Sequence, residues 1–288
     1  MSLLIGSHTS ISGGYFKAVE AAAKFGMKTC QIFTKNSNQW RSKSITDSDV
    51  EQFDLSVKAN EFVKIISHTS YLINLASPKE DLWDKSVEAL ADEWQRAERL
   101  HLDGLVMHPG SATDGDALAG IARIVAGVKK AHSIANPKSS ILLFENTAGQ
   151  GTALGWKIDQ LAAIFDSLER PHYIGICLDS CHAHAAGYDL STIDGTELLV
   201  EAFSKHSLLG SIRAIHLNDS KKPAGSRVDR HEHLGFGTIT EEGLSRFISH
   251  PAFRNLPMYL ETEKEVDSNG RDWDEINMET ALKLYKGS

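Results

Sequence analysis

The sequence has few cysteines for disulfide bonds, no long apolar run that could span a membrane and no signal-peptide pattern. Among its 288 residues are three cysteines, Cys30, Cys177 and Cys181, too few for a disulfide framework and typical of a reducing compartment. No apolar run approaches the roughly 18–20 residues that cross a bilayer, so we expect no membrane protein. Residues 1–13 lack the charged start and long apolar stretch of a signal peptide. We therefore expect a cytoplasmic protein, or a nuclear or organellar one in a eukaryotic cell.

Positive charge is also scarce. Thirty Lys and Arg residues stand against 38 Asp and Glu residues, for a formal net charge of −8. This balance argues against a globally basic nucleic-acid-binding protein, although it permits a local basic patch. Apolar residues make up 41% of the chain and charged residues 24%, which is ordinary globular usage and excludes collagen, coiled coil and disorder. The residue present in unusual number is histidine, with 13 copies.

Eight short apolar segments bounded by polar loops are typical of buried parallel strands. They are Leu3–Ser7, Lys28–Phe33, Val63–Ser67, Gly104–Met107, Ile141–Phe144, Tyr173–Leu178, Ile212–Leu217 and Met258–Leu260. Helical patterns lie between them, one of them expected to begin at a capping box formed by Ser48 and Glu51. Eightfold alternation of strand and helix predicts an α/β protein, a single-domain (β/α)8 TIM barrel over residues 1–288. A doubly wound open sheet is the alternative.

Ionisable side chains stand at the C-terminal ends of seven of the eight predicted strands. In chain order, the residues at or just past each end are His8, Thr34, His68, His108, Glu145, Asp179, His216 and Glu261. Functional sites on this barrel lie at the C-terminal face of the strands, so we expect one ring of nitrogen and oxygen ligands there. Because side chains alternate along a strand, residues two positions earlier should fill the barrel interior. These are Val106, Leu143, Cys177, Ala214 and Tyr259.

Such a ring needs cations, because burying unpaired carboxylates costs several kcal/mol each. Imidazole and carboxylate ligands suit zinc, with manganese or iron as weaker alternatives. His182, Asp229 and His231 could add a third metal site to two in the ring, or could be ordinary hydrogen-bonded residues. We expect His8 to support a ligand by hydrogen bonding. His184 and His233 also lie near the site but compete with better-placed neighbours.

Longer motifs in the same stretches resemble those of the endonuclease IV family of abasic-site endonucleases. They are Ile32-Phe-Thr-Lys-Asn36 with Gln39-Trp-Arg41, Ser70-Tyr-Leu-Ile-Asn-Leu75, His108-Pro-Gly110, Glu145-Asn-Thr-Ala-Gly-Gln-Gly151, Asp179-Ser-Cys-His182, Gly187-Tyr-Asp189, His216-Leu-Asn-Asp219, Gly225-Ser-Arg-Val-Asp-Arg-His231, Leu234-Gly235 and Leu260-Glu-Thr262. The similarity runs from about residue 5 to residue 262. These motifs are long and jointly specific.

The resemblance implies a (β/α)8 barrel with three zinc ions, for which manganese could substitute. It implies cleavage of double-stranded DNA on the 5′ side of an abasic nucleotide, leaving a 3′-hydroxyl and a 5′-deoxyribose phosphate, and trimming of blocked 3′ ends. Carried over by motif, one zinc is held by His68, His108 and Glu145. Glu145 bridges to a second zinc held by Asp179, His216 and Glu261, and the third is held by His182, Asp229 and His231. Glu145 and Glu261 are also possible proton acceptors in the implied hydrolysis.

The resemblance further implies contacts to DNA. Tyr71 and Leu72 match the family's wedge, which is inserted from the minor groove to expose the lesion; the alternative is a loop anchor packed on the barrel rim. Asn38 stands where relatives often carry a groove-inserting Arg, so we expect a weaker or less selective grip. Basic residues on two loops of the same face are expected to contact phosphates: Lys35, Arg41, Arg227 and Arg230.

Two other functions remain open at this point. A metal-dependent sugar isomerase or epimerase would also place Glu, Asp and His at the strand ends, but it would bind one or two metals and ignore DNA. A non-catalytic protein that binds damaged DNA is the second alternative, and the full ligand set argues against it. The resemblance implies a monomer. The tail from Glu263 onward departs from the family pattern, and we expect no more of it than a closing helix.

Overall fold

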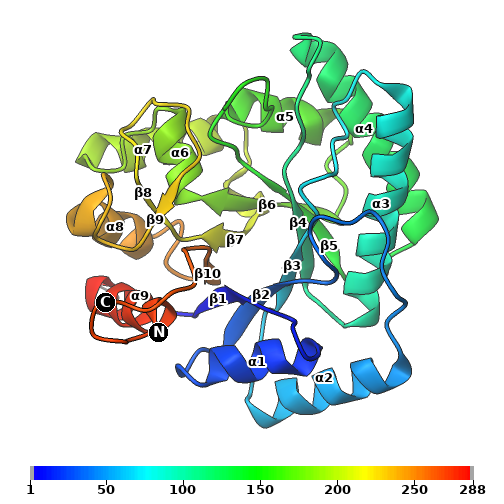
Figure 1. Ribbon diagram of the computed structural model, residues 1–288. Coiled ribbons are helices and arrows are strands. Elements are labelled where there is room, and N and C mark those ends of the chain that lie inside the picture. Colours follow the sequence, from blue (N-terminus) through cyan, green and yellow to red (C-terminus); the bar gives the residue numbers. More distant parts are fainter. Residues whose placement is uncertain (1–2, 286–288) are drawn as a thin grey trace.

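Eight parallel strands close into a barrel, and the helices surround it (Figure 1). The computed structural model describes residues 3–285, so the extreme ends of the predicted 1–288 domain lie outside it. The strands are β1 Ile5–Thr9, β2 Thr29–Phe33, β3 Ile66–His68, β4 Gly104–Met107, β5 Ile141–Glu145, β6 Ile174–Asp179, β7 Ile212–His216 and β10 Met258–Leu260. Their order around the barrel follows the chain, and β10 closes it against β1. The predicted (β/α)8 barrel is confirmed, and the open-sheet alternative is wrong.

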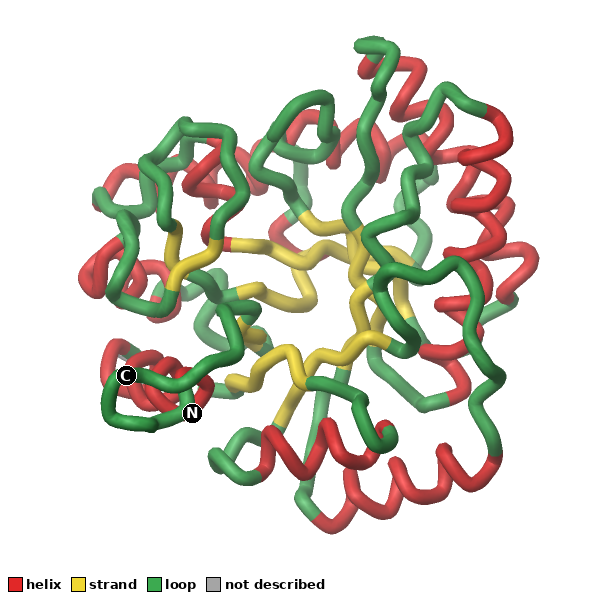
Figure 2. The backbone as a smooth tube through the Cα atoms, in the orientation of Figure 1, coloured by secondary structure: helices red, strands yellow, loops and turns green. Residues whose placement is uncertain are grey.

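The helices form an outer ring around the strands (Figure 2). They are α1 Tyr15–Ala23, α2 Asp47–Ala59, α3 Glu80–Arg99, α4 Ala117–Ala135, α5 Ile158–Ser167, α6 Ser180–Ala186, α7 Ile193–Lys205, α8 Thr240–Ser249 and α9 Trp273–Leu284, with a 3-10 turn at Leu209–Ser211. The expected closing helix is α9, and it is tied to β1 by a 3.1 Å hydrogen bond from Ser7 Oγ to Asp274 Oδ2. Within residues 3–285, no helix has the length and apolar character needed to cross a membrane.

Three predicted boundaries are wrong by two or three residues, and the first is that of β1, which spans Ile5–Thr9 rather than Leu3–Ser7. The capping box of α2 is formed by Thr46 and Asp49 rather than by Ser48 and Glu51. Thr46 is extended and its hydroxyl accepts from the Asp49 amide at 3.1 Å, while Asp49 Oδ2 accepts from the Thr46 amide at 2.8 Å. Strand β3 begins at Ile66 rather than near residue 63, because Lys64 has a φ of 57°, which is incompatible with an extended chain.

The interior of the barrel is a small apolar plug. It consists of Ile66, Val106, Leu143, Cys177, Ala214 and Tyr259. Five of these were predicted from the alternation along the strands, and that prediction is confirmed. Gly6 allows β1 to approach β2 closely, because a Cβ at this position would lie 1.9 Å from the Thr29 carbonyl oxygen. The ionisable side chains gather at the C-terminal ends of the strands, and the plug fills the barrel interior beneath them.

A second, two-stranded sheet lies in the long loop between β7 and α8. Strands β8 Asp219–Ser220 and β9 His231–Glu232 pair antiparallel. The buried carboxylate of Asp219 accepts hydrogen bonds of 2.7–3.0 Å from the backbone amides of Ser220, Gly235, Gly237 and Ile239. These bonds fix the far side of the loop and hold β9 next to the barrel mouth.

Candidate metal centre

All nine predicted ligand side chains converge at the C-terminal face of the barrel. Four of them end their strands: His68 on β3, Glu145 on β5, Asp179 on β6 and His216 on β7. His108 and Glu261 directly follow β4 and β10, His182 lies in the first turn of α6, and Asp229 and His231 come from the β8–β9 hairpin. Their nitrogen and oxygen atoms form three groups, each compact enough to surround one cation.

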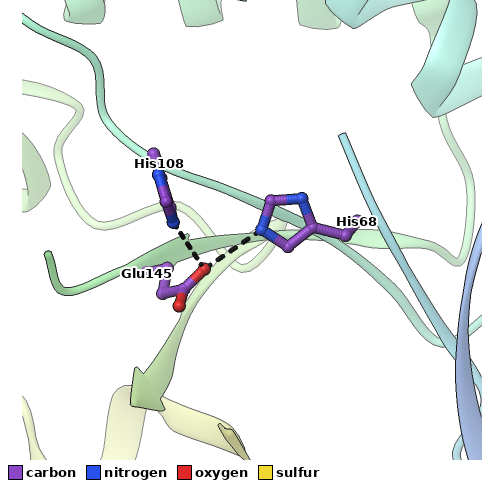
Figure 3. Close-up of side chains that lie close together, drawn as sticks. All are labelled: His68, His108 and Glu145. Carbon is purple, nitrogen blue, oxygen red and sulfur yellow. Dashed lines mark hydrogen bonds and ion pairs between the residues drawn. The ribbon is translucent and has the colours of Figure 1, made fainter. Parts of the chain in front are cut away.

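The first group consists of His68, His108 and Glu145. Figure 3 shows both imidazole rings pointing at the same carboxylate. Each ring places its Nε2 atom 3.1 Å from Glu145 Oε2. Glu145 is fully buried, whereas the His108 side chain is 35% exposed. The group is therefore closed toward the barrel interior at Glu145 and open to solvent at His108.

The second group shares Glu145 with the first. Its other oxygen, Oε1, lies 3.0 Å from His216 Nδ1. The same nitrogen lies 3.1 Å from Glu261 Oε2 and 4.0 Å from Asp179 Oδ2. Asn218 orients both acids: its amide donates to Asp179 Oδ2 at 2.7 Å, and its side-chain oxygen accepts from the Glu261 backbone at 2.8 Å.

The third group joins α6 to the hairpin. His182 Nε2 lies 3.0 Å from Asp229 Oδ2, and His231 Nε2 lies 3.4 Å from Asp229 Oδ1. Helix α6 begins where the side chain of its N-cap Asp179 accepts from the His182 amide at 2.6 Å. This cap fixes the first turn and with it the direction of the His182 ring.

The imidazole rings are held by acceptors that leave one nitrogen free for a ligand role. His68 Nδ1 lies 2.8 Å from the Thr69 carbonyl oxygen, His182 Nδ1 lies 2.9 Å from that of Asn146, and His231 Nδ1 lies 3.2 Å from that of Glu261. A carbonyl oxygen only accepts, so Nδ1 carries a proton in these rings and Nε2 is the nitrogen that would face a metal.

The ionisable groups of the centre shift one another's pKa. Burial opposes ionisation of Glu145, but the imidazoles of His216 and His108 outweigh it and hold the pKa of Glu145 well below its usual range. Burial likewise opposes a charged His182, yet Asp179 and Asp229 raise the pKa of His182 well above its ordinary value. The pKa of Glu261 is lowered, against the effect of burial, chiefly by His216 and His8. The carboxylates thus favour positive charge throughout the centre.

The residues fit divalent metal ions on three counts. The Nε2 atoms of His182 and His231 are buried without a hydrogen-bond partner among the described residues, although Asp229 is close to both. Most of the quoted contacts between ligand atoms are 3.0–3.4 Å, near the about 3.3 Å between two ligands on a tetrahedral zinc. The donor set of imidazole and carboxylate is the one zinc binds in hydrolytic sites.

Two polar neighbours of the centre, Gln31 and Cys181, were not predicted from the sequence. Gln31 lies on β2 and contacts both His216 and Glu261. Cys181 lies with Asp179 and His231 in a further group of possible ligands. Burial, however, raises the pKa of the Cys181 thiol to about 12, which disfavours a thiolate. Gln31 had a weak signal, as a lone amide within an apolar strand.

His8 and two nearby histidines are not members of the three ligand groups. His8 Nδ1 lies 2.9 Å from Gln31 Nε2 and 3.5 Å from Glu261 Oε1, which agrees with a supporting position. His184 Nδ1 accepts from the Leu190 amide at 3.2 Å. His233 stacks on Trp273 with ring centroids 3.9 Å apart. Neither His184 nor His233 belongs to a ligand group within the described chain.

The expected wedge residues lie on the loop after β3, beside the centre. The Tyr71 side chain is 62% exposed, and its ring lies 5.6 Å from those of both His68 and Phe33. Leu72 is half-buried, and its amide donates to Ser70 Oγ at 3.2 Å. Tyr71 is therefore exposed at the barrel mouth, and its ring packs against Phe33 and His68.

Lys35 does not offer the free cation that we expected for a DNA phosphate. Its side chain is 1% exposed, and its ammonium lies 3.2 Å from Glu93 Oε1 and donates to the Trp40 carbonyl at 3.0 Å. Helix α3 places Glu93 beside this ammonium, so the charge of Lys35 is already paired inside the protein. Asn38 and Arg41, on the same loop, are exposed.

Arg227 and Arg230 lie on the hairpin loop and are exposed. The Arg227 guanidinium stacks 4.3 Å from the centre of the Trp156 ring and donates to the Gly149 carbonyl at 2.9 Å. Arg230 donates to the Asp229 carbonyl at 2.6 Å. Both cations lie within two residues of Asp229, a member of the third ligand group.

Comparison with known proteins places the chain in a family. Residues 19–283 match the family described as xylose isomerase-like TIM barrel. The chain is 40% identical to "Probable endonuclease 4" of Halothermothrix orenii over 94% of its own length and 96% of that protein. It is 42% identical to the protein of the same name from Trichlorobacter lovleyi, over 96% and 98% of the two chains.

Solved structures agree. The crystal structure of endonuclease IV from Thermus thermophilus has 34% sequence identity and a TM-score of 0.85, covering 97% of this chain and 98% of its own. A D-psicose 3-epimerase has a TM-score of 0.70 at 13% identity, covering 98% and 96%, a likeness that shows the fold alone. The chain therefore belongs to the endonuclease IV family and is an enzyme of the hydrolase class.

Proposed function

We propose that the protein is a zinc-dependent DNA-repair endonuclease that hydrolyses the phosphodiester on the 5′ side of abasic sites in double-stranded DNA. The products would be a 3′-hydroxyl and a 5′-deoxyribose phosphate, and the same site would trim blocked 3′ ends. The observation that carries the proposal is the set of nine candidate ligands in three compact groups at the barrel mouth, in a chain of this family. Three zinc ions per chain are expected, with manganese as a possible substitute.

The roles of the residues follow from their positions. His68, His108 and Glu145 would hold one metal, Glu145, Asp179, His216 and Glu261 a second, and His182, Asp229 and His231 the third. When bound, such metals lower the pKa of water and neutralise charge that develops on a phosphoryl group. Glu145 and Glu261 would place carboxylate oxygens next to the reacting phosphate and would accept protons there.

The rim of the centre would hold the DNA. Tyr71 and Leu72 would enter the duplex beside the lesion and help to expose it. Arg41, Arg227 and Arg230 would contact phosphates of the backbone, so binding should weaken as salt increases. We propose that Lys35 instead orders the loop that carries Asn38, because its charge is already paired with Glu93.

Sugar epimerisation is the alternative, supported by the shared fold of the epimerase structures. The third ligand group and the exposed Tyr71 favour the nuclease, since a small sugar needs neither. We also propose that the enzyme acts as a monomer. Its relatives quoted above come from bacteria, so we propose the cytoplasm, where bacterial DNA lies, as its place of action.

A cleavage assay tests the proposal. Labelled duplex with a single abasic analogue is incubated with the protein beside the same duplex without the lesion, and D-psicose conversion is measured in parallel. We expect one nick in the damaged strand only, its loss in a His108→Ala variant and no sugar conversion. Sugar conversion without a nick, or nicking that survives unchanged in His108→Ala, would contradict the proposal.

A further inference from the structure

Gln31 is a fully buried polar residue that the proposed chemistry does not use. It lies on β2, and its side-chain amide contacts three residues: two ligands of the second group and His8. Its Oε1 atom lies 2.7 Å from His216 Nε2, and its Nε2 atom lies 2.6 Å from Glu261 Oε1 and 2.9 Å from His8 Nδ1. A buried amide with this many partners on the ligands themselves calls for a function in the centre.

The network allows one orientation of the amide. Glu261 accepts only, so the atom 2.6 Å from its Oε1 must be the NH2 group of Gln31. The reversed amide would place its carbonyl oxygen against the carboxylate. With the NH2 group on Glu261, the Gln31 carbonyl faces His216 Nε2. A carbonyl cannot donate, so His216 carries its proton on Nε2.

His216 differs from the other rings in which nitrogen it presents. His68, His182 and His231 turn Nδ1 toward a backbone carbonyl and present Nε2. His216 is reversed: Nδ1 lies 3.0 Å from Glu145 Oε1 and 3.1 Å from Glu261 Oε2. The acceptor that fixes its proton is a side chain, Gln31, instead of the backbone. A substitution of residue 31 can therefore change the tautomer of His216. The other three rings face backbone carbonyls, which remain whatever side chain the residue carries.

We propose that Gln31 is a positioning residue that selects the ligand atoms of two residues at once. It keeps the proton of His216 on Nε2, which leaves the Nδ1 lone pair for the metal of the second group. It also engages Oε1 of Glu261, which leaves Oε2 for the same metal. The inference rests on the proposed metal centre, but it predicts a property of one ligand group and not of the others.

Zinc competition tests the proposal without DNA. Wild-type protein, Gln31→Met and Thr29→Val are titrated against a chromophoric chelator, with Thr29→Val as a control on the same strand. Substitution of a residue that hydrogen-bonds to metal ligands typically changes the metal affinity by about 10–100-fold. We expect Gln31→Met to lower the affinity for one of the three zinc ions by this factor and to leave the affinities for the other two unchanged. Thr29→Val should match the wild type.

Steady-state kinetics separate positioning from a loss of fold. Gln31→Met should lower kcat on abasic duplex by a similar factor and leave KM unchanged, because Gln31 lies beneath the metal ligands and not on the DNA-facing rim. Wild-type zinc affinities together with an unchanged kcat in this variant would overturn the proposal. If the wild type does not cleave abasic DNA, the proposed function fails, yet the zinc titration still decides the role of Gln31.

A measurement on the unaltered holoenzyme covers the case in which Gln31→Met does not fold. Protein labelled with 15N in histidine is loaded with zinc, and long-range 1H–15N correlation assigns the tautomer of each ring, with His216→Gln identifying the signal. We expect the proton of His216 on Nε2 and those of His68, His182 and His231 on Nδ1. A His216 proton on Nδ1 would refute the proposal.

Discussion

Nδ1 of His216 lies 3.0 Å from Oε1 of Glu145, although 71 residues separate them in the chain. The other oxygen of Glu145 faces His68 and His108 at 3.1 Å. One buried carboxylate thus belongs to two ligand groups. The two groups should therefore fail together when that carboxylate is removed.

Glu145→Gln tests this shared position. The amide is isosteric but uncharged, and its NH2 group cannot bind a metal, so we expect loss of two zinc ions and a fall in cleavage of more than about 100-fold, beyond the typical effect of an outer group. Metal content after dialysis and the cleavage rate are the measurements. Glu242→Gln, an exposed change on α8, should keep both. Full metal content in Glu145→Gln would show that the carboxylate is no ligand.

The pH dependence of metal binding follows from the charged histidines. In the metal-free protein, burial opposes the charge on His182, but Asp179 and Asp229 raise its pKa well above 6.5. His182 is therefore protonated at neutral pH and must lose its proton to bind zinc. The stability that its charge gives the metal-free fold is complete below pH 6.5 and is lost as the pH rises through the raised pKa. Zinc affinity changes in the opposite sense and rises with pH.

Calorimetry measures this linkage directly. Zinc is titrated into metal-free protein in two buffers of equal pH but different ionisation enthalpy, and the difference gives the protons released. We expect proton release at neutral pH that declines as the pH is raised. Zinc uptake at neutral pH without proton release would mean that the ligand histidines are already neutral.

Tyr71 is expected to act on DNA and not on metal. Stacking of a base on an aromatic ring is worth about 1–3 kcal/mol, so Tyr71→Ala should weaken binding of abasic duplex by roughly 5- to 150-fold. Leu118→Ala, which removes another exposed apolar side chain, should have no effect. Equilibrium binding in the presence of a chelator, with metal content measured separately, distinguishes the two roles. Equal affinities of Tyr71→Ala and wild type would leave Tyr71 as a loop anchor.

Asn38 offers a gain of function. An arginine at this exposed position adds a charge and length, so Asn38→Arg should bind abasic duplex more tightly and steepen the dependence of log affinity on log salt by about 0.9 per new phosphate contact. Asn38→Gln adds length without charge and should keep the wild-type slope. The measurement is affinity at several salt concentrations. An arginine variant that binds no more tightly would remove Asn38 from the DNA-contact set.

The buried pair of Lys35 and Glu93 should stabilise the loops after β2 and β3 at the rim. Glu93 also accepts from the Ser70 amide, at 3.1–3.2 Å, just before Tyr71. Glu93→Gln removes the buried partner of Lys35 and leaves only the half-exposed carboxylate of Asp92, 3.7 Å from the ammonium, so the free energy of unfolding should fall by up to about 3–5 kcal/mol. The double variant Lys35→Met/Glu93→Leu removes both charges and should recover most of this loss. Chemical denaturation measures both, and a double variant no more stable than Glu93→Gln would contradict a buried-charge effect.

The strand ends were readable from the sequence because the barrel imposes a simple rule. Parallel strands bring their C-terminal ends to one face, so His68, Glu145 and Asp179 meet wherever their strands are identified correctly. The inward residues followed from alternation, as Leu143 and Cys177 show. These predictions depend on local periodicity, which one sequence reveals.

Other features depend on contacts between distant segments. Helix α6 is too short for a periodic pattern, and it begins at the side-chain cap of Asp179, which is also a ligand residue. Neither the pairing of β8 with β9 nor the burial of Lys35 against Glu93 has a local signal. Gln31 was overlooked because its partners, His216 and Glu261, lie 185 and 230 residues further along the chain.

The most direct test of the account is metal-dependent cleavage with the product ends identified. Protein freed of metal by a chelator is compared with untreated protein and with protein given zinc again, on a duplex carrying one abasic analogue. The account predicts a single nick 5′ to the lesion, with a 3′-hydroxyl that a polymerase extends, lost on chelation and restored by zinc. A nick that persists without metal, or one on the 3′ side of the lesion, would contradict it.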